Sequence, residues 1–334
     1  MKKIGIALAC LLMAVGCCAC GATEEQPLDV NVYMPDGAPA LALAGMMATD
    51  TQDDGVNYRV VDAKLIASKV TNQDGAKNAD LCVMPITAAS KLLGGGAKYT
   101  MLGAVTHGNL YLLAKEGAYT QENLASLVGK KVGVLQINEV PGLTFKAVLS
   151  KHGIAWQELT NDGTMDETKV NLVALADASA VAAVEADCYM IAEPAASAQV
   201  QKNGFVLAGS VQELYGGEEG YPQAVLVAKN ELLETRADWV EQFVAQVAEA
   251  PQWLKTATGE EIVAAVGAHM DDPDAATSLK APLLSSGVLE RCGIFFTYAA
   301  ATKVQAMAFL GEMISVKADA AAIPADSFFW QYQQ

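Results

Sequence analysis

Short apolar runs of strand length alternate with helical patterns along most of this chain, and this alternation restricts the fold more than any other feature. The first cycle predicts a strand at Val30–Met34, a helix at Ala40–Ala48, a strand at Tyr58–Val61 and a helix at Ala63–Thr71. Strands that alternate with helices usually form a mainly parallel sheet covered by helices. The sequence therefore predicts an α/β fold.

The same cycle is repeated further along the chain. A strand at Asp80–Pro85 leads into a helix at Thr87–Leu93, for which Thr87 is the predicted N-cap. A second set begins with a strand at Lys130–Leu135 and a helix at Leu143–His152. An alanine-rich tail, from Arg236 to about Leu310, has a helical pattern. The doubled set predicts two similar α/β lobes, and such lobes bind ligands between them, at the carboxyl ends of strands.

Two extended segments join the predicted lobes. The polar break Thr106–Asn109 is the candidate hinge, and the glycine-rich stretch Gly216–Gly220 precedes the return of the chain. We therefore expect lobe 1 to comprise residues 28–108 and 222–334, and lobe 2 to comprise residues 109–221. About 305 folded residues exceed the size at which a single core usually stops growing, in agreement with two lobes.

The N-terminus has the layout of a signal peptide. Two lysines are followed by an uncharged, mostly apolar run from Ile4 to Gly16. This run of about 13 residues is too short to span a membrane as a helix, which requires ~20. The order Met13–Gly16 before Cys17 resembles the signal of bacterial lipoproteins and implies a lipid-modified Cys17. An ordinary secretory signal is the alternative, because Ala14 occupies a position where such signals usually carry leucine.

This layout divides the N-terminal segment into a signal peptide at residues 1–16 and a polar tether at residues 17–27. We expect a protein outside the cytoplasm, anchored to the cell membrane only by the lipid on Cys17. The composition argues against nucleic acid as a partner, because 38 acidic and 22 basic side chains give a net charge of −16.

The cysteines of the folded part do not form a metal-binding pattern. Cys82, Cys188 and Cys292 are widely separated and include no CxxC pair, so we expect small buried apolar residues and no metal. The chain contains no Ser-His-Asp set, glycine-rich phosphate loop or His-x-x-His spacing. We therefore expect a binding protein without a cofactor, and not an enzyme.

Four segments carry a resemblance to a known family: MPDGAPALALA at 34–44, ADLCVMPITAASKL at 79–92, LVGKKVGVLQ at 127–136 and DCYMIAEPAAS at 187–197. They resemble substrate-binding proteins of ABC importers, in the family that binds nitrate, taurine, alkane sulfonates and thiamine-type pyrimidines. The resemblance covers nearly the whole chain after the signal. It implies a type II periplasmic-binding-protein fold, a monomer that closes on a small solute, and permease and ATPase partners.

In lobe 1, the candidate solute contacts follow strands. Asp36, Gly37 and Ala38 lie in the turn after the first strand, where the N–H groups of the next helix would point between the lobes. A plain Pro-Asp-Gly turn is the alternative. Thr87 would either donate its hydroxyl to the solute or cap its helix. At the proposed hinge, the candidates are His107 and Asn109.

In lobe 2, Gln136, Asn138 and Glu139 match the family's second ligand-binding loop. Glu193 matches a Glu-Pro element of the family, in which the acid either faces the solute or caps the following helix. Tyr221, at the return of the chain, is the candidate for stacking on a planar ring.

The charged residues indicate a class of solute. The chain has only three arginines, Arg59, Arg236 and Arg291. We expect none of them in a loop between the lobes, which disfavours a sulfonate or an inorganic anion. The acceptors Asp36, Glu139 and Glu193 instead favour a donor-rich or cationic nitrogen heterocycle, such as a pyrimidine or a vitamin precursor.

Two other functions are compatible with the same fold. Yeast-type pyrimidine synthases share it, but they use cysteine and histidine motifs with iron, which this sequence lacks after the signal. A ligand-sensing surface lipoprotein is the second alternative, and the sequence leaves it open.

Overall fold

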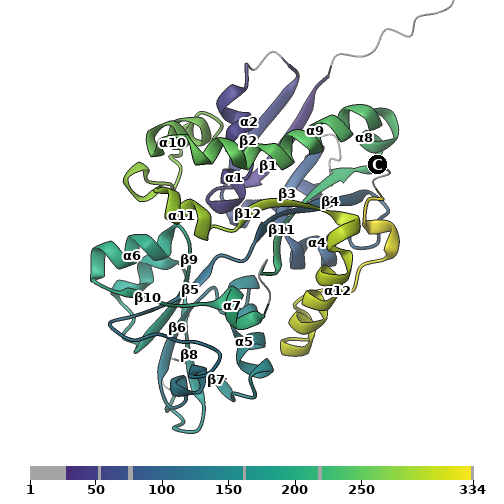
Figure 1. Ribbon diagram of the computed structural model, residues 1–334. Coiled ribbons are helices and arrows are strands. Elements are labelled where there is room, and N and C mark those ends of the chain that lie inside the picture. Colours follow the sequence, from purple (N-terminus) through teal and green to yellow (C-terminus); the bar gives the residue numbers. More distant parts are fainter. Residues whose placement is uncertain (1–27, 52–53, 74–77, 161–162, 217–219, 332–334) are drawn as a thin grey trace, which may run out of the picture.

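The computed structural model describes residues 28–51, 54–73, 78–160, 163–216 and 220–331 (Figure 1). The predicted signal peptide, Cys17 and the tether at residues 17–27 lie outside these ranges. Cys82, Cys188 and Cys292 are buried and unpaired, as predicted. None of the helices in the described part of the chain combines the length and the apolar character that a bilayer crossing requires.

Lobe 1 is built on sheet A, whose strand order is β12-β4-β11-β3-β1-β2. Its strands are β1 (Val30–Pro35), β2 (Val56–Val61), β3 (Leu81–Pro85), β4 (Tyr99–His107), β11 (Pro222–Lys229) and β12 (Ile294–Tyr298). The three N-terminal strands are parallel, whereas β11 runs antiparallel to both β3 and β4. Every residue of β4 is buried, which fits a strand covered on both faces.

Lobe 2 is built on sheet B, whose strand order is β10-β5-β9-β6-β8-β7. Its strands are β5 (Leu110–Ala114), β6 (Lys131–Leu135), β7 (Trp156–Glu158), β8 (Val170–Leu175), β9 (Cys188–Ala192) and β10 (Val206–Ser210). The chain passes from β4 to β5 through Gly108 and Asn109, and Tyr221 precedes β11 on the return. These two crossovers join the sheets.

Helices cover both faces of the sheets. They are α1 (Ala38–Leu41), α2 (Ala44–Thr49), α3 (Ser68–Thr71), α4 (Ile86–Leu93), α5 (Val140–Lys151), α6 (Ala195–Asn203), α7 (Val211–Tyr215), α8 (Asn230–Thr235), α9 (Ala237–Glu249), α10 (Gly259–Gly267), α11 (Ser286–Arg291) and α12 (Ala299–Val316). One apolar cluster lies between sheet A and α1, α2, α9 and α10. A second cluster covers the other face of sheet A and continues through α12 into lobe 2.

Several predicted elements differ from the observed ones. The helix predicted at residues 40–48 is divided into α1 and α2, and the helix predicted at residues 63–71 is a 3₁₀ turn followed by α3. Pro85, not Thr87, is the N-cap of α4. The helical tail is interrupted by β12, because Ile294–Tyr298 pairs with β4 at the sheet edge. This pairing depends on a partner far away in sequence, which local periodicity does not reveal.

Candidate functional site

The strand registers place the carboxyl edges of the two sheets opposite each other. In sheet A, β4 and β3 are both antiparallel to β11, so β4 is parallel to β3 and β1 and ends at the same edge. The chain leaves this edge at His107. In sheet B, Leu110 of β5 pairs with Ala192 of β9, so β5 starts where β9 and its parallel neighbour β6 end. The loops that follow β1, β3, β6 and β9 therefore lie between the two sheets.

The turn after β1 is held by contacts within lobe 1. The Asp36 carboxylate accepts hydrogen bonds from Thr277 Oγ1 at 2.7 Å, from the Ser278 N–H at 2.6 Å and from the Gly37 N–H at 2.9 Å. Gly37 has a φ of +99°, and a Cβ there would meet no atom within 4 Å. The Asp36 side chain is thus used to fix the turn, while the backbone at Gly37 borders open space.

The loop after β6 presents polar side chains to solvent. Gln136, Asn138 and Glu139 are all exposed. Gln136 has a φ of +45°, its N–H donates to Leu175 O, and its carbonyl accepts from the Glu139 N–H at 2.9 Å. The backbone of this turn is hydrogen-bonded, so its side chains remain accessible to a solute.

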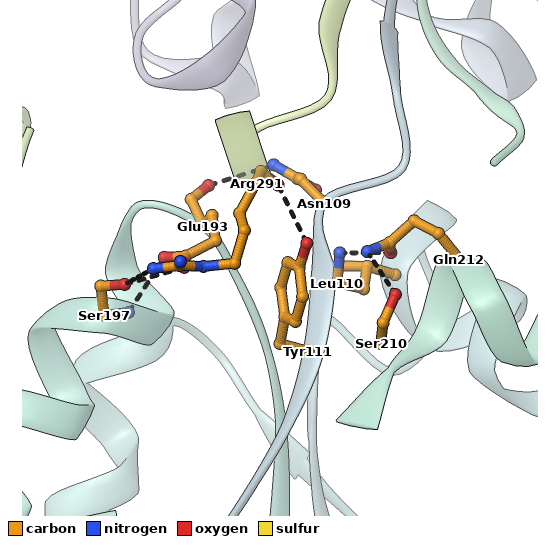
Figure 2. Close-up of polar contacts among 8 residues, drawn as sticks. All are labelled: Asn109, Leu110, Tyr111, Glu193, Ser197, Ser210, Gln212 and Arg291. Carbon is orange, nitrogen blue, oxygen red and sulfur yellow. Dashed lines mark hydrogen bonds and ion pairs between the residues drawn. The ribbon is translucent and has the colours of Figure 1, made fainter. Parts of the chain in front are cut away.

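Glu193, at the end of β9, is buried and belongs to a hydrogen-bonded ion pair (Figure 2). Its carboxylate accepts from the Ser197 N–H at 2.9 Å and the Ser197 hydroxyl at 2.8 Å. Arg291 Nε donates to the same carboxylate at 2.7 Å, and Arg291 Nη2 donates to Ser197 Oγ at 2.9 Å. Glu193 therefore bonds to the first turn of α6, in line with its predicted capping alternative, and its charge is balanced by Arg291.

Asn109 connects the first crossover to the same cluster. The side-chain N–H of Asn109 donates to the backbone oxygen of Glu193 at 3.0 Å, and the backbone oxygen of Asn109 accepts from the Glu193 N–H at 2.8 Å. The side-chain oxygen of Asn109 is buried without a hydrogen-bond partner among the described residues. A buried acceptor without a partner is uncommon in proteins and is a candidate for a contact with a bound molecule.

His107 is held by the protein's own side chains. Its Nε2 lies 2.9 Å from Thr297 Oγ1, and its ring stacks on Phe295 with 3.8 Å between centroids and 8° between planes. Burial lowers the pKa of His107 to about 4, so the imidazole is neutral at pH 7. His107 is therefore a neutral side chain at the end of β4.

Tyr221 is fully buried, contrary to the expectation that its ring borders the solute. Its ring stacks on Phe309 with 5.0 Å between centroids and 6° between planes, and it contacts Tyr215 edge to face. In lobe 1, Ala38 and Thr87 are also buried, at the first turns of α1 and α4. Tyr221 is thus part of the packing against α12, and a planar solute would need another partner.

A cavity of about 640 Å³ lies beside the first crossover. Both lobes line it, and its wall includes His107, Tyr111, Gln212, Leu254, Arg291 and Phe295. The Tyr111 hydroxyl donates to Arg291 O at 3.4 Å, and burial raises the pKa of Tyr111 to about 12. Of the predicted solute contacts that are described, only His107 lines this cavity. The cavity adjoins the facing loops at Arg291, which lines the cavity and also binds Glu193 after β9.

The expectation that no arginine lies between the lobes is wrong. Arg291 ends α11 and reaches Glu193 of the other lobe. The two residues are separated by 98 positions, and no local pattern in the sequence reveals the contact. Among the described residues, no cluster of His, Cys, Asp and Glu side chains could hold a metal ion.

Several solved structures have a fold that is similar to most of this chain. An ABC transporter from Parabacteroides distasonis is 18% identical, with 92% of this chain and 100% of that chain covered and a TM-score of 0.68. The periplasmic aliphatic sulphonate binding protein SsuA from Escherichia coli is 15% identical, with 92% and 94% covered and a TM-score of 0.65. The alkanesulfonate-binding protein SsuA from Xanthomonas axonopodis, bound to MOPS, is 13% identical, with 90% and 96% covered and a TM-score of 0.57.

These similarities establish the type II periplasmic-binding-protein fold that the sequence predicts. None of the curated proteins compared with the chain matches it. The model of the NMT1-like family matches residues 63–268, which is more than half of the chain. This protein therefore belongs to the NMT1-like family.

Proposed function

We propose that this protein is the solute-binding component of an ABC-type importer and captures a small solute between its lobes without catalysing a reaction. The observation that carries the proposal is the opposition of the two carboxyl edges across the crossovers. Ligands of open α/β sheets bind outside these edges. A solute held by loops of both lobes would favour lobe closure, because it contacts both surfaces only when they approach.

The proposed solute contacts are the groups that the protein's own structure leaves accessible. They are the backbone at Gly37, which borders open space, and the exposed side chains of Gln136, Asn138 and Glu139. The buried, unpartnered side-chain oxygen of Asn109 is added as an acceptor, whereas Ala38 and Thr87 are buried and would contact the solute only after a local rearrangement. Asp36 and Glu193 support the site instead, because their carboxylates already bind other groups of the protein.

We propose a nitrogen heterocycle with N–H donors, of the pyrimidine or vitamin-precursor type, as the solute. Glu139 and the side-chain oxygens of Asn109, Gln136 and Asn138 are acceptors for such donors. Arg291 adds no unbalanced positive charge for an anion, because the buried Glu193 carboxylate neutralises it. The alternative solute is a sulfonate, which is the ligand class in the names of two similar structures. The experiment must therefore distinguish binding of a heterocycle from binding of a sulfonate.

A ligand screen of the full chain tests both parts of this proposal. A solute that binds only the folded protein raises its stability by about 2.7 kcal/mol at a concentration of 100 Kd. We expect pyrimidines to raise the Tm, and we expect Glu139→Gln to weaken that effect, while the matched variant Glu122→Gln, at an exposed position of lobe 2, does not. Stabilisation by sulfonates alone would exclude the heterocycle, and a flat response to the whole panel would oppose the binding function.

The proposed arrangement places the protein outside the cytoplasm. In it, a lipid on Cys17 and the tether at residues 17–27 hold a monomer beside its permease and ATPase, with lobe 1 at residues 28–108 and 222–334 and lobe 2 at residues 109–221. The resemblance of Met13–Gly16 to a lipoprotein signal supports the anchor. Incorporation of labelled palmitate in cells should be lost in Cys17→Ser and retained in Cys18→Ser. Equal labelling of both variants would place the lipid elsewhere.

A further inference from the structure

The two lobes touch on both sides of the crossovers, and the two contacts differ in chemistry. On one side, Arg291 of α11 in lobe 1 binds Glu193 and Ser197 of lobe 2 (Figure 2). On the other side, α12 of lobe 1 packs against α5 of lobe 2. In the view of Figure 1, α11 and α12 lie to the left and to the right of the crossover strands. The contact at Arg291 is polar and includes the hydrogen bond from the Tyr111 hydroxyl to Arg291 O, whereas the contact at α12 is mainly apolar.

The contact through α12 is mainly apolar and buried, with a hydrogen bond from Gln305 Nε2 to Gly220 O at 2.8 Å. Phe309 of α12 stacks on Tyr221 of the return crossover and contacts Tyr215 of α7 edge to face. Met313 Sδ lies 4.0 Å from Thr144 Oγ1 of α5, and both side chains are completely buried. Separation of α12 from α5 would expose this apolar surface to water. Such exposure is unfavourable, and no solute contact compensates for it.

The contact through Arg291 is polar and borders solvent. The Glu193 side chain is 0% exposed, but the Arg291 side chain is 32% exposed and lines the open cavity. When the lobes separate here, water can form hydrogen bonds to both ions in place of those lost between them, whereas an exposed apolar surface gains no such bonds. In this pair, a side chain of α11 binds the residue that follows β9, at the carboxyl edge of sheet B.

We propose that the Arg291–Glu193 ion pair is a latch across the solute entrance, and that the lobes open on the α11–α6 side while α12 and α5 stay packed. The solute would then enter and leave past Arg291, which acts as a positioning residue for closure. The role of the entrance rests on the proposed solute-binding function. The latch itself is a property of the protein without solute.

The test compares Arg291→Gln with Lys303→Gln in the full chain without solute. Lys303 is a matched control, because its ion pair with Asp326 at 2.8 Å is confined to lobe 1. Hydrogen exchange and small-angle scattering report on the opening. In Arg291→Gln, we expect amide exchange in α6 and α11 to become about tenfold faster, as for a loss of about 1.4 kcal/mol. We also expect a larger radius of gyration and unchanged exchange in α5 and α12.

Three further results complete the test. Lys303→Gln should leave the exchange and the radius unchanged, and Arg291→Lys should restore part of the closure. If Arg291→Gln fails to fold because Glu193 loses its counter-charge, Arg291→Gln/Glu193→Gln removes both charges and should still show the opening. An unchanged radius and unchanged exchange in α6 and α11 would overturn the latch, as would equal acceleration in α5 and α12. Because no solute is present, these outcomes are independent of the ligand screen.

Discussion

Replacement of Phe309 by alanine tests the packing through which α12 joins the two lobes. The side chain is completely buried and stacks on the ring of Tyr221 at 5.0 Å. Truncation of a buried phenylalanine costs about 3–5 kcal/mol, because apolar contacts are lost and a cavity is left behind. This is a large part of a typical stability of about 5–15 kcal/mol. At about 2–4 °C per kcal/mol, the Tm of Phe309→Ala should be lower by about 10 °C.

Urea unfolding, followed by the fluorescence of the four tryptophans, measures this change. Val304 provides the control on the same helix, because it is 82% exposed. Val304→Ala should stay within about 0.5 kcal/mol of the parent protein. The reasoning would be refuted if Phe309→Ala lowered the free energy of unfolding by less than about 1 kcal/mol, or if the two variants lowered it equally. Phe309 would then not be a main apolar contact between α12 and lobe 2.

Three other predictions concern the hinge and a helix end. Burial lowers the pKa of His107 to about 4 from its ordinary value of 6.5, so below pH 6.5 the unfolded chain takes up a proton that the folded protein does not. The contribution of His107 should therefore lower the free energy of unfolding by about 3 kcal/mol between about pH 7 and pH 4. Urea titrations over this pH range should show a decrease that is smaller by this amount in His107→Gln. Gly108→Ala should cost about 2 kcal/mol in the same assay, because φ is +65° and the new Cβ would lie 2.4 Å from Gln212 Cγ; a neutral effect would contradict this hinge geometry. Thr258→Ala should lower stability by about 1 kcal/mol through loss of its capping box with Glu261, which calorimetry can detect.

The sequence correctly predicts the position of a strand where the strand is an apolar run bounded by turn residues. The predicted strand at Asp80–Pro85 corresponds to β3, and the one at Lys130–Leu135 corresponds to β6. Both are central and buried, so hydrophobicity alone marks them. Strand β12 lies inside the alanine-rich tail for which the sequence predicts helix, and it forms a strand by pairing with β4, which is far away in the sequence.

For the candidate site, too, the sequence predicts some features and misses others. The positions of Gln136 and Glu193 at strand ends follow from the local sequence, because a strand must end where a turn begins. Their chemical state does not. The structure leaves the Gln136 side chain exposed and buries that of Glu193 against an arginine.

The sequence by itself therefore determined the α/β class, the two sets of strands and the loops that lie at their carboxyl ends, because these follow from periodicity and turn residues within short windows. Only the tertiary structure decided that Arg291 neutralises Glu193, that Tyr221 packs under Phe309 and that α12 joins the lobes. The physical reason is that ion pairing, burial and ring stacking depend on distances in space between residues that are far apart along the chain.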